Sequence, residues 1–346
     1  MNINEAKDIV INAGKMLVEQ GLIQRTWGNV SQRVDKNTMA ITPSGRDYLS
    51  LKRDDIVLVN INTLEYEGNV KPSSEKGVHA ACYKNKDVNF VIHTHQECAS
   101  VISGLGIDSI DAAEQYTLLD EKVLCAPYGL PSTKKLVKGV EETLKKTSAG
   151  CLIMRNHGAL CFGADFEQTF DAASQLEAAC NEYLENEYLR KAKKTEFSEH
   201  EFCEYALKIN GAKMPEAKGE KPDIKLGANL ILNDSKEAAA LSVLKKPLRP
   251  MVDDFAQIVG MKMKKVKNKE SAILKALKKS DAVFVQGMGA VCRGKKEGDS
   301  EAVSMIVEKN CRAFLAAAVI GRVRPINPME SRLMRTVYKL KYSKQK

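Results

Sequence analysis

The chain has 346 residues, of which 44% are hydrophobic and 28% are charged, and its mean hydropathy is −0.30. These values are near the globular average and the length suffices for about two domains, so they argue against a disordered or fibrous chain. The formal net charge is +9, but the lysines are scattered among acidic residues and aromatic residues do not alternate with them. We therefore expect no nucleic-acid partner.

The apolar runs and the cysteines indicate the compartment. The longest apolar run, Ala313–Gly321, is far shorter than the roughly 20 residues that cross a membrane, and residues 1–17 contain no apolar signal-peptide core. The nine cysteines include no Cys-x-x-Cys pair and mostly have apolar neighbours, which is typical of reduced, buried thiols. The sequence therefore predicts a cytoplasmic protein without a membrane partner.

Helical and strand patterns alternate along the chain, which indicates an α/β fold. Residues 1–20 have the apolar spacing of an amphipathic helix. Short strands are expected next, followed by longer buried strands and helices. The expected strands are 38–42, 56–61, 89–95 and 151–155, and the further expected helices are 132–145 and 165–191.

A composition change divides the chain. Residues 210–225 are rich in Gly, Pro and Lys and have the composition of a linker. We therefore expect a first domain over residues 1–209, a linker over 210–227 and a second domain over 228–346.

The second domain resembles a shortened copy of the first. The segment GALCFG at Gly158–Gly163 matches GAVCRG at Gly289–Gly294, and Cys180 matches Cys311 at the same offset along the chain. Upstream, Phe90–Ala99 resembles Leu230–Ala239 at a slightly larger offset. The copy would thus have lost a short stretch between the two matches.

The histidines of the first half are missing from this copy. At these offsets, Asn233, Ser235 and Met288 stand where the first half has His93, His95 and His157. We therefore expect a degenerate repeat without a metal site.

Three histidines have the spacing of metal ligands. His93 and His95 are one residue apart on a predicted strand, so both imidazoles point to the same face. His157 follows the next buried strand in a tight Asn-His-Gly sequence. Three neutral imidazoles with an open fourth position describe a catalytic zinc site, although a His-x-His pair alone also occurs among core and surface histidines.

Three short segments rich in hydroxyl groups are candidate anion sites. Ser73 and Ser74 precede a predicted helix, where free backbone amides favour anions, but helix capping gives the same pattern. Gly28–Ser31 and Thr42–Gly45 have the composition of turns. Glu75 follows the serines, and His79 lies one helical turn after it, where it is either an orienting partner of the carboxylate or a core histidine.

Together these segments resemble, in order and spacing, the class II aldolase/adducin family over about residues 1–190. The segments are Gly21–Ser31, Ile41–Gly45, Lys71–Glu75, His93–His95, Cys125–Tyr128 and Asn156–Gly158. The resemblance implies a three-layer α/β/α fold with a central, mostly antiparallel sheet, zinc held by the three histidines, and Glu75 as the acid/base carboxylate.

The resemblance also implies a phosphate site and an oligomer. Phosphate-binding positions of the family match Thr26, Gly28, Asn29, Ser44, Gly45, Ser73 and Ser74. Tyr116 lies in the stretch where the aldolases carry a tyrosine that acts in the neighbouring subunit, although the surrounding residues differ. A homo-oligomer, a tetramer by resemblance, is therefore expected.

The implied reaction is cleavage of a small ketose 1-phosphate to dihydroxyacetone phosphate and an aldehyde such as lactaldehyde. It passes through an enediolate, with zinc as the Lewis acid and Glu75 as the proton acceptor, whose pKa burial would raise.

Two alternatives remain open. The first is a zinc-dependent dehydratase or epimerase of a pentulose phosphate, such as a methylthioribulose-phosphate dehydratase; by resemblance, Glu rather than Asp at position 75 argues against the epimerase. The second is a non-enzymatic, adducin-like module, against which the complete histidine set argues.

Overall fold

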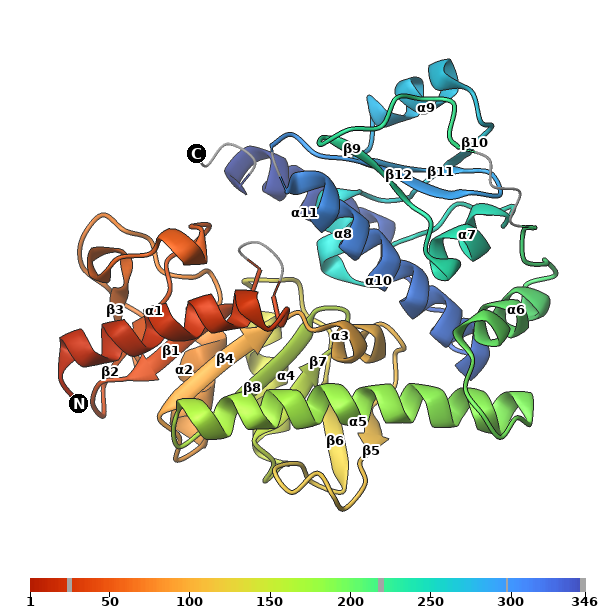
Figure 1. The fold of residues 1–346 in the computed structure, drawn as a ribbon. Helices are drawn as coiled ribbons and strands as arrows, with labels where there is room; N and C mark the ends of the chain where they lie inside the picture. The colour runs from red at the N-terminus through yellow and green to blue at the C-terminus, as the bar shows by residue number, and fades with distance from the viewer. Residues whose placement is uncertain (24–26, 217–220, 297, 343–346) are drawn as a thin grey trace. The chain divides into compact units, whose positions relative to one another are not determined.

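The computed structural model describes residues 1–23, 27–216, 221–296 and 298–342. They form two compact units (Figure 1), of which the first comprises residues 1–103 with 107–183 and the second residues 104–106 with 184–346. In the described ranges, no helix combines the length and the apolar character that a membrane span requires.

A mixed eight-stranded sheet forms the centre of the first unit, in the order β3-β2-β1-β4-β8-β7-β6-β5. All neighbouring strands are antiparallel except β6 and β7, which are parallel. The expected mostly antiparallel sheet is therefore confirmed. The strands are β1 (Asn29–Arg33), β2 (Thr38–Ile41), β3 (Val57–Asn60), β4 (Phe90–Thr94), β5 (Ser109–Asp111), β6 (Lys122–Ala126), β7 (Cys151–Met154) and β8 (Gly158–Gly163).

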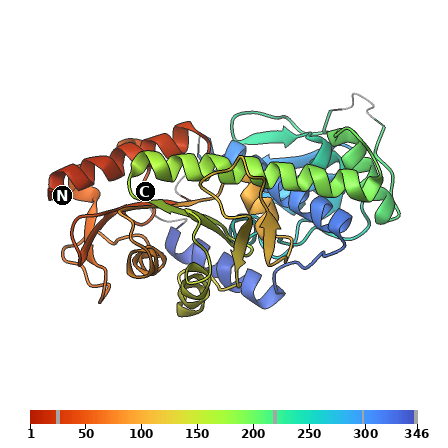
Figure 2. The ribbon, with the colours of Figure 1, turned by 90° about the horizontal axis from the view of Figure 1, so that it is seen from below.

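Helices cover both faces of this sheet. Helices α1 and α5 lie on one face and α2 and α4 on the other (Figure 2). The apolar core under α2 and α4 includes Val78, Val140 and Leu152. The helices are α1 (Ile3–Glu19), α2 (Lys76–Asn85), α3 (Glu97–Ser103), α4 (Lys134–Leu144) and α5 (Phe166–Ala192), with two short 3-10 helices, η1 (Tyr48–Ser50) and η2 (Arg53–Asp55).

The elements expected from the sequence are present, with one exception, while β5, β6, β8 and α3 were not expected. Gly28–Ser31 was expected to be a turn, but Asn29–Ser31 belong to the buried strand β1. The pattern misleads because Asn29 and Ser31 are polar, whereas both are buried and hydrogen-bonded to side chains of α2 or to Glu75, which precedes it.

The second unit has its own four-stranded sheet, in the order β10-β11-β12-β9. Its strands are β9 (Leu230–Asn233), β10 (Lys265–Val266), β11 (Ala282–Val285) and β12 (Gly289–Arg293). Its helices are α6 (Glu199–Ile209), α7 (Lys236–Ser242), α8 (Asp253–Ile258), α9 (Glu270–Leu277), α10 (Asp299–Ile320) and α11 (Pro328–Val337), which continues into the π-helical η3 (Tyr338–Tyr342). The boundaries expected at 209 and 228 stay a prediction.

The two sheets share one pairing pattern. β10 and β11 are parallel and the other pairs are antiparallel, as in the series β6-β7-β8-β4 of the first unit. The pair Cys151–Cys161 of β7 and β8 recurs, at the offset of the GALCFG match, as Ala282–Cys292 of β11 and β12. The register of this hairpin therefore agrees with the repeat seen in the sequence.

On the adjacent strand, the structure corrects the sequence alignment by one residue. Thr94 of β4 pairs with Ala159, and Asn233 of β9 pairs with Ala290. A Cβ atom at Gly158 would clash with the carbonyl oxygen of Thr94, and one at Gly289, which corresponds to Gly158, would clash in the same way with Asn233. Asn233 therefore corresponds to Thr94 and not to His93. The offset along this strand is thus one residue smaller than in the sequence alignment.

This correction changes the counterparts of two histidines. Leu232 corresponds to His93 and Asp234 to His95, in place of Asn233 and Ser235, while Met288 still corresponds to His157. Helices α3 and α7, which follow these strands, agree, since each has seven residues and they begin at Glu97 and Lys236. The sequence alignment is displaced by one residue because it matches similar residues at the start of both helices, whereas the strand register depends on the neighbouring strand.

Candidate metal centre

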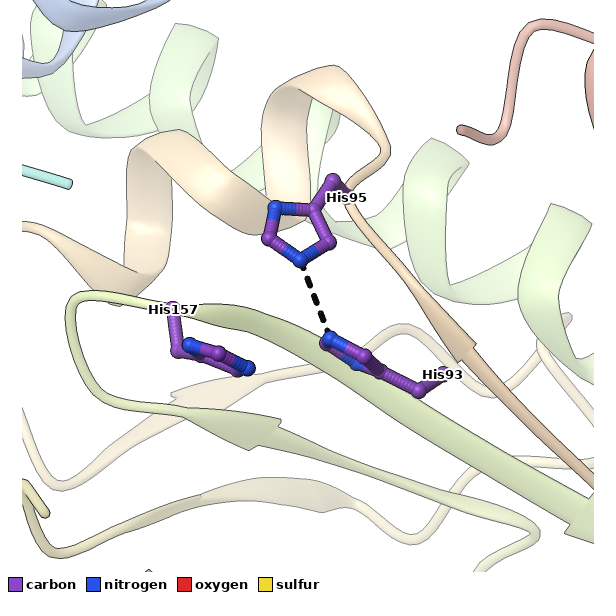
Figure 3. Close-up of side chains that lie close together, drawn as sticks. All are labelled: His93, His95 and His157. Atoms are coloured by element: carbon purple, nitrogen blue, oxygen red, sulfur yellow. Dashed lines mark hydrogen bonds between the residues drawn. The ribbon is translucent and has the colours of Figure 1, made fainter. Parts of the chain in front are cut away.

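Three imidazoles meet where β4 ends and β7 turns into β8 (Figure 3). His93 is in β4, His95 directly follows it, and His157 lies in the turn between β7 and β8. This turn is tight because Asn156 has a left-handed φ of 60° and the His157 amide donates to the carbonyl of Met154. Gly158 lets the turn approach the end of β4, because a side chain there would clash with Thr94.

The geometry of the triad is that of a metal site. One nitrogen of each ring lies within 4.8 Å of one nitrogen of both others, and the Nε2 atoms of His93 and His95 are 3.0 Å apart. The rings of His93 and His157 stack with centroids 4.7 Å apart. All three side chains are buried, so the expected grouping is confirmed.

The protonation of His93 also suits a metal ligand. Its Nδ1–H donates to the carbonyl of Ala159 at 2.8 Å, which leaves the Nε2 lone pair facing the other rings. Burial lowers the pKa of His93 well below its ordinary value, so the ring is neutral at pH 7. The donor set therefore fits a divalent metal ion held by three neutral imidazoles.

Glu75 lies against this triad. It precedes α2, and its Oε1 and Oε2 atoms lie 2.9 Å from His157 Nε2 and 3.2 Å from His93 Nε2. Burial raises the pKa of Glu75, but the imidazoles of His157 and His93 lower it by more, so it lies well below its ordinary value. Burial therefore acts on this pKa in the expected direction, but the net direction is downward, and the carboxylate is ionised and able to accept a proton.

The candidate phosphate-binding residues are partly gathered at the same place. Asn29 pairs with His93 across β1 and β4. The amide of Ser44 donates to the carbonyl of Lys71, and that of Ser73 donates to Thr42, so the turn at Ser44 and Gly45 lies beside the segment that leads to Glu75. Thr26 lies outside the described residues.

Not all of these residues are placed as free phosphate donors. The Asn29 amide donates to Glu75 Oε2 at 3.4 Å, and the Ser73 hydroxyl accepts from the Glu75 amide. Ser74 is exposed and Gly28 has a φ of 110° in the bend before β1. The role of the whole set stays a prediction.

Tyr116 is not brought to the triad within this chain. It lies in the connection between β5 and β6, and its hydroxyl donates to Glu182 of α5 at 2.8 Å. A role in a neighbouring subunit stays a prediction.

Three further residues lie near Glu75. The sequence leaves His79 as an orienting partner of the carboxylate or a core histidine, indicates a turn at Ser31, and does not single out Tyr83. Ser31, His79 and Tyr83 form buried hydrogen bonds that lead to Asn29. The sequence signal for two of them is their spacing from Glu75, because residues four apart share one face of a helix.

Comparison with known proteins agrees with this site. The Class II Aldolase and Adducin N-terminal domain model matches residues 8–184. The 5-deoxy-D-ribulose 1-phosphate aldolase of Bacillus thuringiensis is 29% identical over 195 residues, which are 56% of this chain and 91% of that protein. The L-fuculose phosphate aldolase of Haemophilus influenzae is 31% identical over 190 residues, or 53% of this chain and 84% of that protein.

A solved structure is similar as well. An L-fuculose 1-phosphate aldolase superposes with a TM-score of 0.50 at 29% identity, covering 57% of this chain and 92% of its own. Because the family model matches half of the chain and the matched part holds the buried triad, the chain belongs to the class II aldolase and adducin family, as a metal-dependent sugar-phosphate enzyme.

Proposed function

We propose that this enzyme is a zinc-dependent carbon–carbon lyase that cleaves a small ketose 1-phosphate to dihydroxyacetone phosphate and a short aldehyde. The observation that carries the proposal is the buried Glu75 carboxylate, 2.9 and 3.2 Å from two nitrogens of the triad. A base beside a Lewis-acid site suits proton removal next to a ketone.

The names of the relatives narrow the substrate. A 5-deoxypentulose 1-phosphate would give dihydroxyacetone phosphate and acetaldehyde, whereas a 6-deoxyhexulose 1-phosphate would give lactaldehyde. Both substrates share the three carbons that become dihydroxyacetone phosphate and differ only in the aldehyde part. We propose 5-deoxyribulose 1-phosphate as the first substrate to test, because the 5-deoxy-D-ribulose 1-phosphate aldolase aligns over 91% of its length.

The chain's own residues would supply proton transfer and orientation. Zinc bound by the triad would polarise the carbonyl and hydroxyl oxygens of the substrate. Glu75 takes the proton from the hydroxymethyl carbon in the direction of condensation and returns it in the direction of cleavage. The Ser44–Gly45 turn and the Ser73–Ser74 segment would hold the phosphate and so fix the reacting carbon against the carboxylate.

We further propose that the second unit is a degenerate repeat of the first. Its support is the shared strand order and register. A glutamate at the same position of the long helix accepts hydrogen bonds in both units, although from different donors. The Glu177 carboxylate of α5 accepts from the first amides of α3. Glu308 of α10, which corresponds to Glu177 at the offset of the hairpins, accepts from Asn233 at the end of β9. In residues 221–296 and 298–342, no strand pairs with β9 as β1 pairs with β4.

Deuterium uptake tests the proposed reaction. The zinc-loaded chain should exchange a proton at the hydroxymethyl carbon of dihydroxyacetone phosphate in D₂O, as followed by proton NMR. Glu75→Gln should lower the exchange rate by about 10²- to 10⁴-fold and retain zinc, while Glu67→Gln, an exposed carboxylate of the same connection, should not change it.

Product analysis separates cleavage from the alternative. With 5-deoxyribulose 1-phosphate, dihydroxyacetone phosphate and acetaldehyde indicate cleavage, whereas a product that retains all five carbons and loses water indicates a dehydratase. No deuterium uptake by the zinc-replete chain would contradict the aldolase proposal.

A further inference from the structure

A buried chain of polar side chains leads from the core to Glu75. The hydroxyl of Tyr83 is 2.8 Å from Ser31 Oγ, and Ser31 Oγ is 2.6 Å from His79 Nδ1. His79 Nε2 is hydrogen-bonded to Asn29 Oδ1, and Asn29 Nδ2 is 3.4 Å from Glu75 Oε2. Each of these side chains is 6% exposed or less.

We propose that Tyr83, Ser31, His79 and Asn29 act as positioning residues, which hold the Glu75 carboxylate in place as the proton acceptor. This inference rests on the proposed function, in which Glu75 is the base.

The residue spacing of one helix and one strand brings these side chains together. Glu75, His79 and Tyr83 are four residues apart, so they lie along one face at the start of α2. Asn29 and Ser31 alternate on β1 and therefore point to the same side of the strand. Asn29 is also the partner of His93 in the β1–β4 pairing, so one strand links the helix face to the metal ligands.

The direction of every hydrogen bond follows from Glu75. An ionised carboxylate only accepts hydrogen bonds, so Asn29 must turn its NH₂ group to Glu75 and its oxygen to His79. An amide oxygen also only accepts, and His79 Nε2 therefore carries the hydrogen.

The remaining protons are then fixed as well. Burial lowers the pKa of His79 to about 4, so the ring is neutral and its Nδ1 accepts the hydrogen of Ser31. Because the Ser31 hydrogen is used, the Tyr83 hydroxyl donates to Ser31 Oγ at 2.8 Å, which is closer than its other acceptor, the carbonyl of Asn89 at 3.5 Å.

This order means that the hydrogen-bonded side chains orient Glu75 but do not conduct protons to or from it. Flipping the Asn29 amide would set its oxygen against the carboxylate and its NH₂ against the His79 N–H, and both contacts are unfavourable in a buried site. Asn29 thus holds Oε2 of Glu75, while Oε1 lies 2.9 Å from His157 Nε2. An amide does not pass protons on, so the proton stays with the carboxylate and the substrate.

Two replacements of His79 test the inference. His79→Gln keeps a donor and an acceptor, whereas His79→Leu has neither. We expect His79→Leu to lower kcat for deuterium exchange of dihydroxyacetone phosphate by about 10- to 100-fold, as for a misplaced catalytic group, with KM and zinc content unchanged. His79→Gln should recover part of this loss.

A matched pair of serine variants controls for the loss of a buried hydroxyl. Ser31→Ala should lower kcat, while Ser103→Ala, which removes a buried hydroxyl that donates to the Ser100 carbonyl, should not. If the wild type exchanges deuterium and His79→Leu and Ser31→Ala behave like Ser103→Ala, the inference is overturned and the proposed function stands.

A second readout does not depend on activity. Nitrogen-15 NMR of the histidine rings should show His79, assigned by its absence from His79→Gln, as the neutral Nε2–H form at pH 7. An Nδ1–H form or a charged ring would overturn the inference. If the wild type exchanges no deuterium but shows the Nε2–H form, the proposed function fails and the hydrogen-bond order is retained.

Discussion

The series β6-β7-β8-β4 of the first unit and β10-β11-β12-β9 of the second have the same order, directions and register. They differ in what surrounds them. In the first unit, β1–β3 extend the sheet beyond β4. Asn29 lies in β1, and Glu75 lies in the connection from β3 to α2. In the described part of the second unit, the sheet ends at β9. In the first unit, the series β6-β7-β8-β4 thus positions the three histidines, and the part of the chain before β4 supplies the base, Glu75.

The helices that pack on the two frameworks differ at matched positions. Lys309 of α10 and Asp254 of α8 form an ion pair of 3.0 Å in which each side chain is 1% exposed. The position of Lys309 corresponds to Ala178 of α5, which is exposed. In the second unit, α8 therefore covers the face of α10 that holds Lys309. The matching face of α5 in the first unit is exposed at Ala178.

The largest expected effect comes from breaking this ion pair. Lys309→Met leaves the buried Asp254 carboxylate without its cation, so the free energy of unfolding should fall by roughly 3–5 kcal/mol. Urea unfolding measures this change. The double variant Lys309→Met with Asp254→Asn should recover much of the loss.

An exposed lysine of the same unit is the control. Lys275→Met should change the free energy of unfolding by no more than about 0.5 kcal/mol. If Lys309→Met destabilises the chain as little as this control, α8 does not depend on the pair.

The sequence predicts the main helices and strands and the metal ligands, because both follow from residue spacing within single segments. Alternation places His93 and His95 on one face, and the tight Asn-His-Gly turn presents His157. The assignment of Glu75 needed the family resemblance, since nothing in its own segment separates a base from a helix cap. The polar strand β1 was missed because what permits burial of Ser31 is His79, 48 residues away.

The direction of the Glu75 pKa was missed for the same reason. A buried carboxylate alone has a raised pKa, and the lowering comes from imidazoles of distant segments, His157 in the turn between β7 and β8 and His93 in β4. The one-residue correction of the repeat also depends on partners, because a strand's register is set by its neighbour. What escapes the sequence here is pairing between distant segments.

Two buried titratable groups should give the units opposite pH dependences. Burial lowers the pKa of His79 to about 4, with Glu75 opposing this shift. The unfolded state, with the ordinary value of 6.5, binds more protons between these values, so the stabilisation from neutral His79 is complete above pH 6.5 and is lost as the pH falls toward 4. The loss is roughly 3 kcal/mol.

Glu237 of the second unit has the reverse sign. Burial raises its pKa to about 7, the carboxylates of Glu199 and Glu308 add to this, and Arg312 opposes it. The folded state binds more protons between the ordinary value of 4.5 and about 7, so this stabilisation is complete below pH 4.5 and is lost as the pH rises through 7, again by roughly 3 kcal/mol.

Unfolding free energies measured from pH 4 to 8 check both signs. The difference between wild type and His79→Gln should grow with pH, and that between wild type and Glu237→Gln should shrink. Equal slopes in the wild type and a variant would show that the replaced group does not titrate differently on unfolding.

The smallest expected effect is the gain of a weak metal site in the second unit. In the proposed repeat, Leu232, Asp234 and Met288 correspond to the three native ligands, so histidines at these positions should converge. The triple variant, made in a chain whose own site is removed by His93→Ala and His157→Ala, should bind Co²⁺ with a tetrahedral absorption spectrum. Its affinity should be lower than that of the native site, because Asp234 is exposed and Leu232 and Met288 are only half-buried.

The alternative register gives the sharpest control for this comparison. Asn233 lies on the opposite side of β9, where its amide donates to the Ser304 hydroxyl and the Glu308 carboxylate of α10. Ser235, the N-cap of α7, is the other position of this alternative. Histidines at these two positions, combined with Met288→His, would face α10 instead of the turn between β11 and β12, since a shift of one residue reverses the face of a strand. If these variants bind cobalt and the variants at Leu232, Asp234 and Met288 do not, the larger offset of the sequence alignment is correct. The two units would then not share one arrangement of ligand positions.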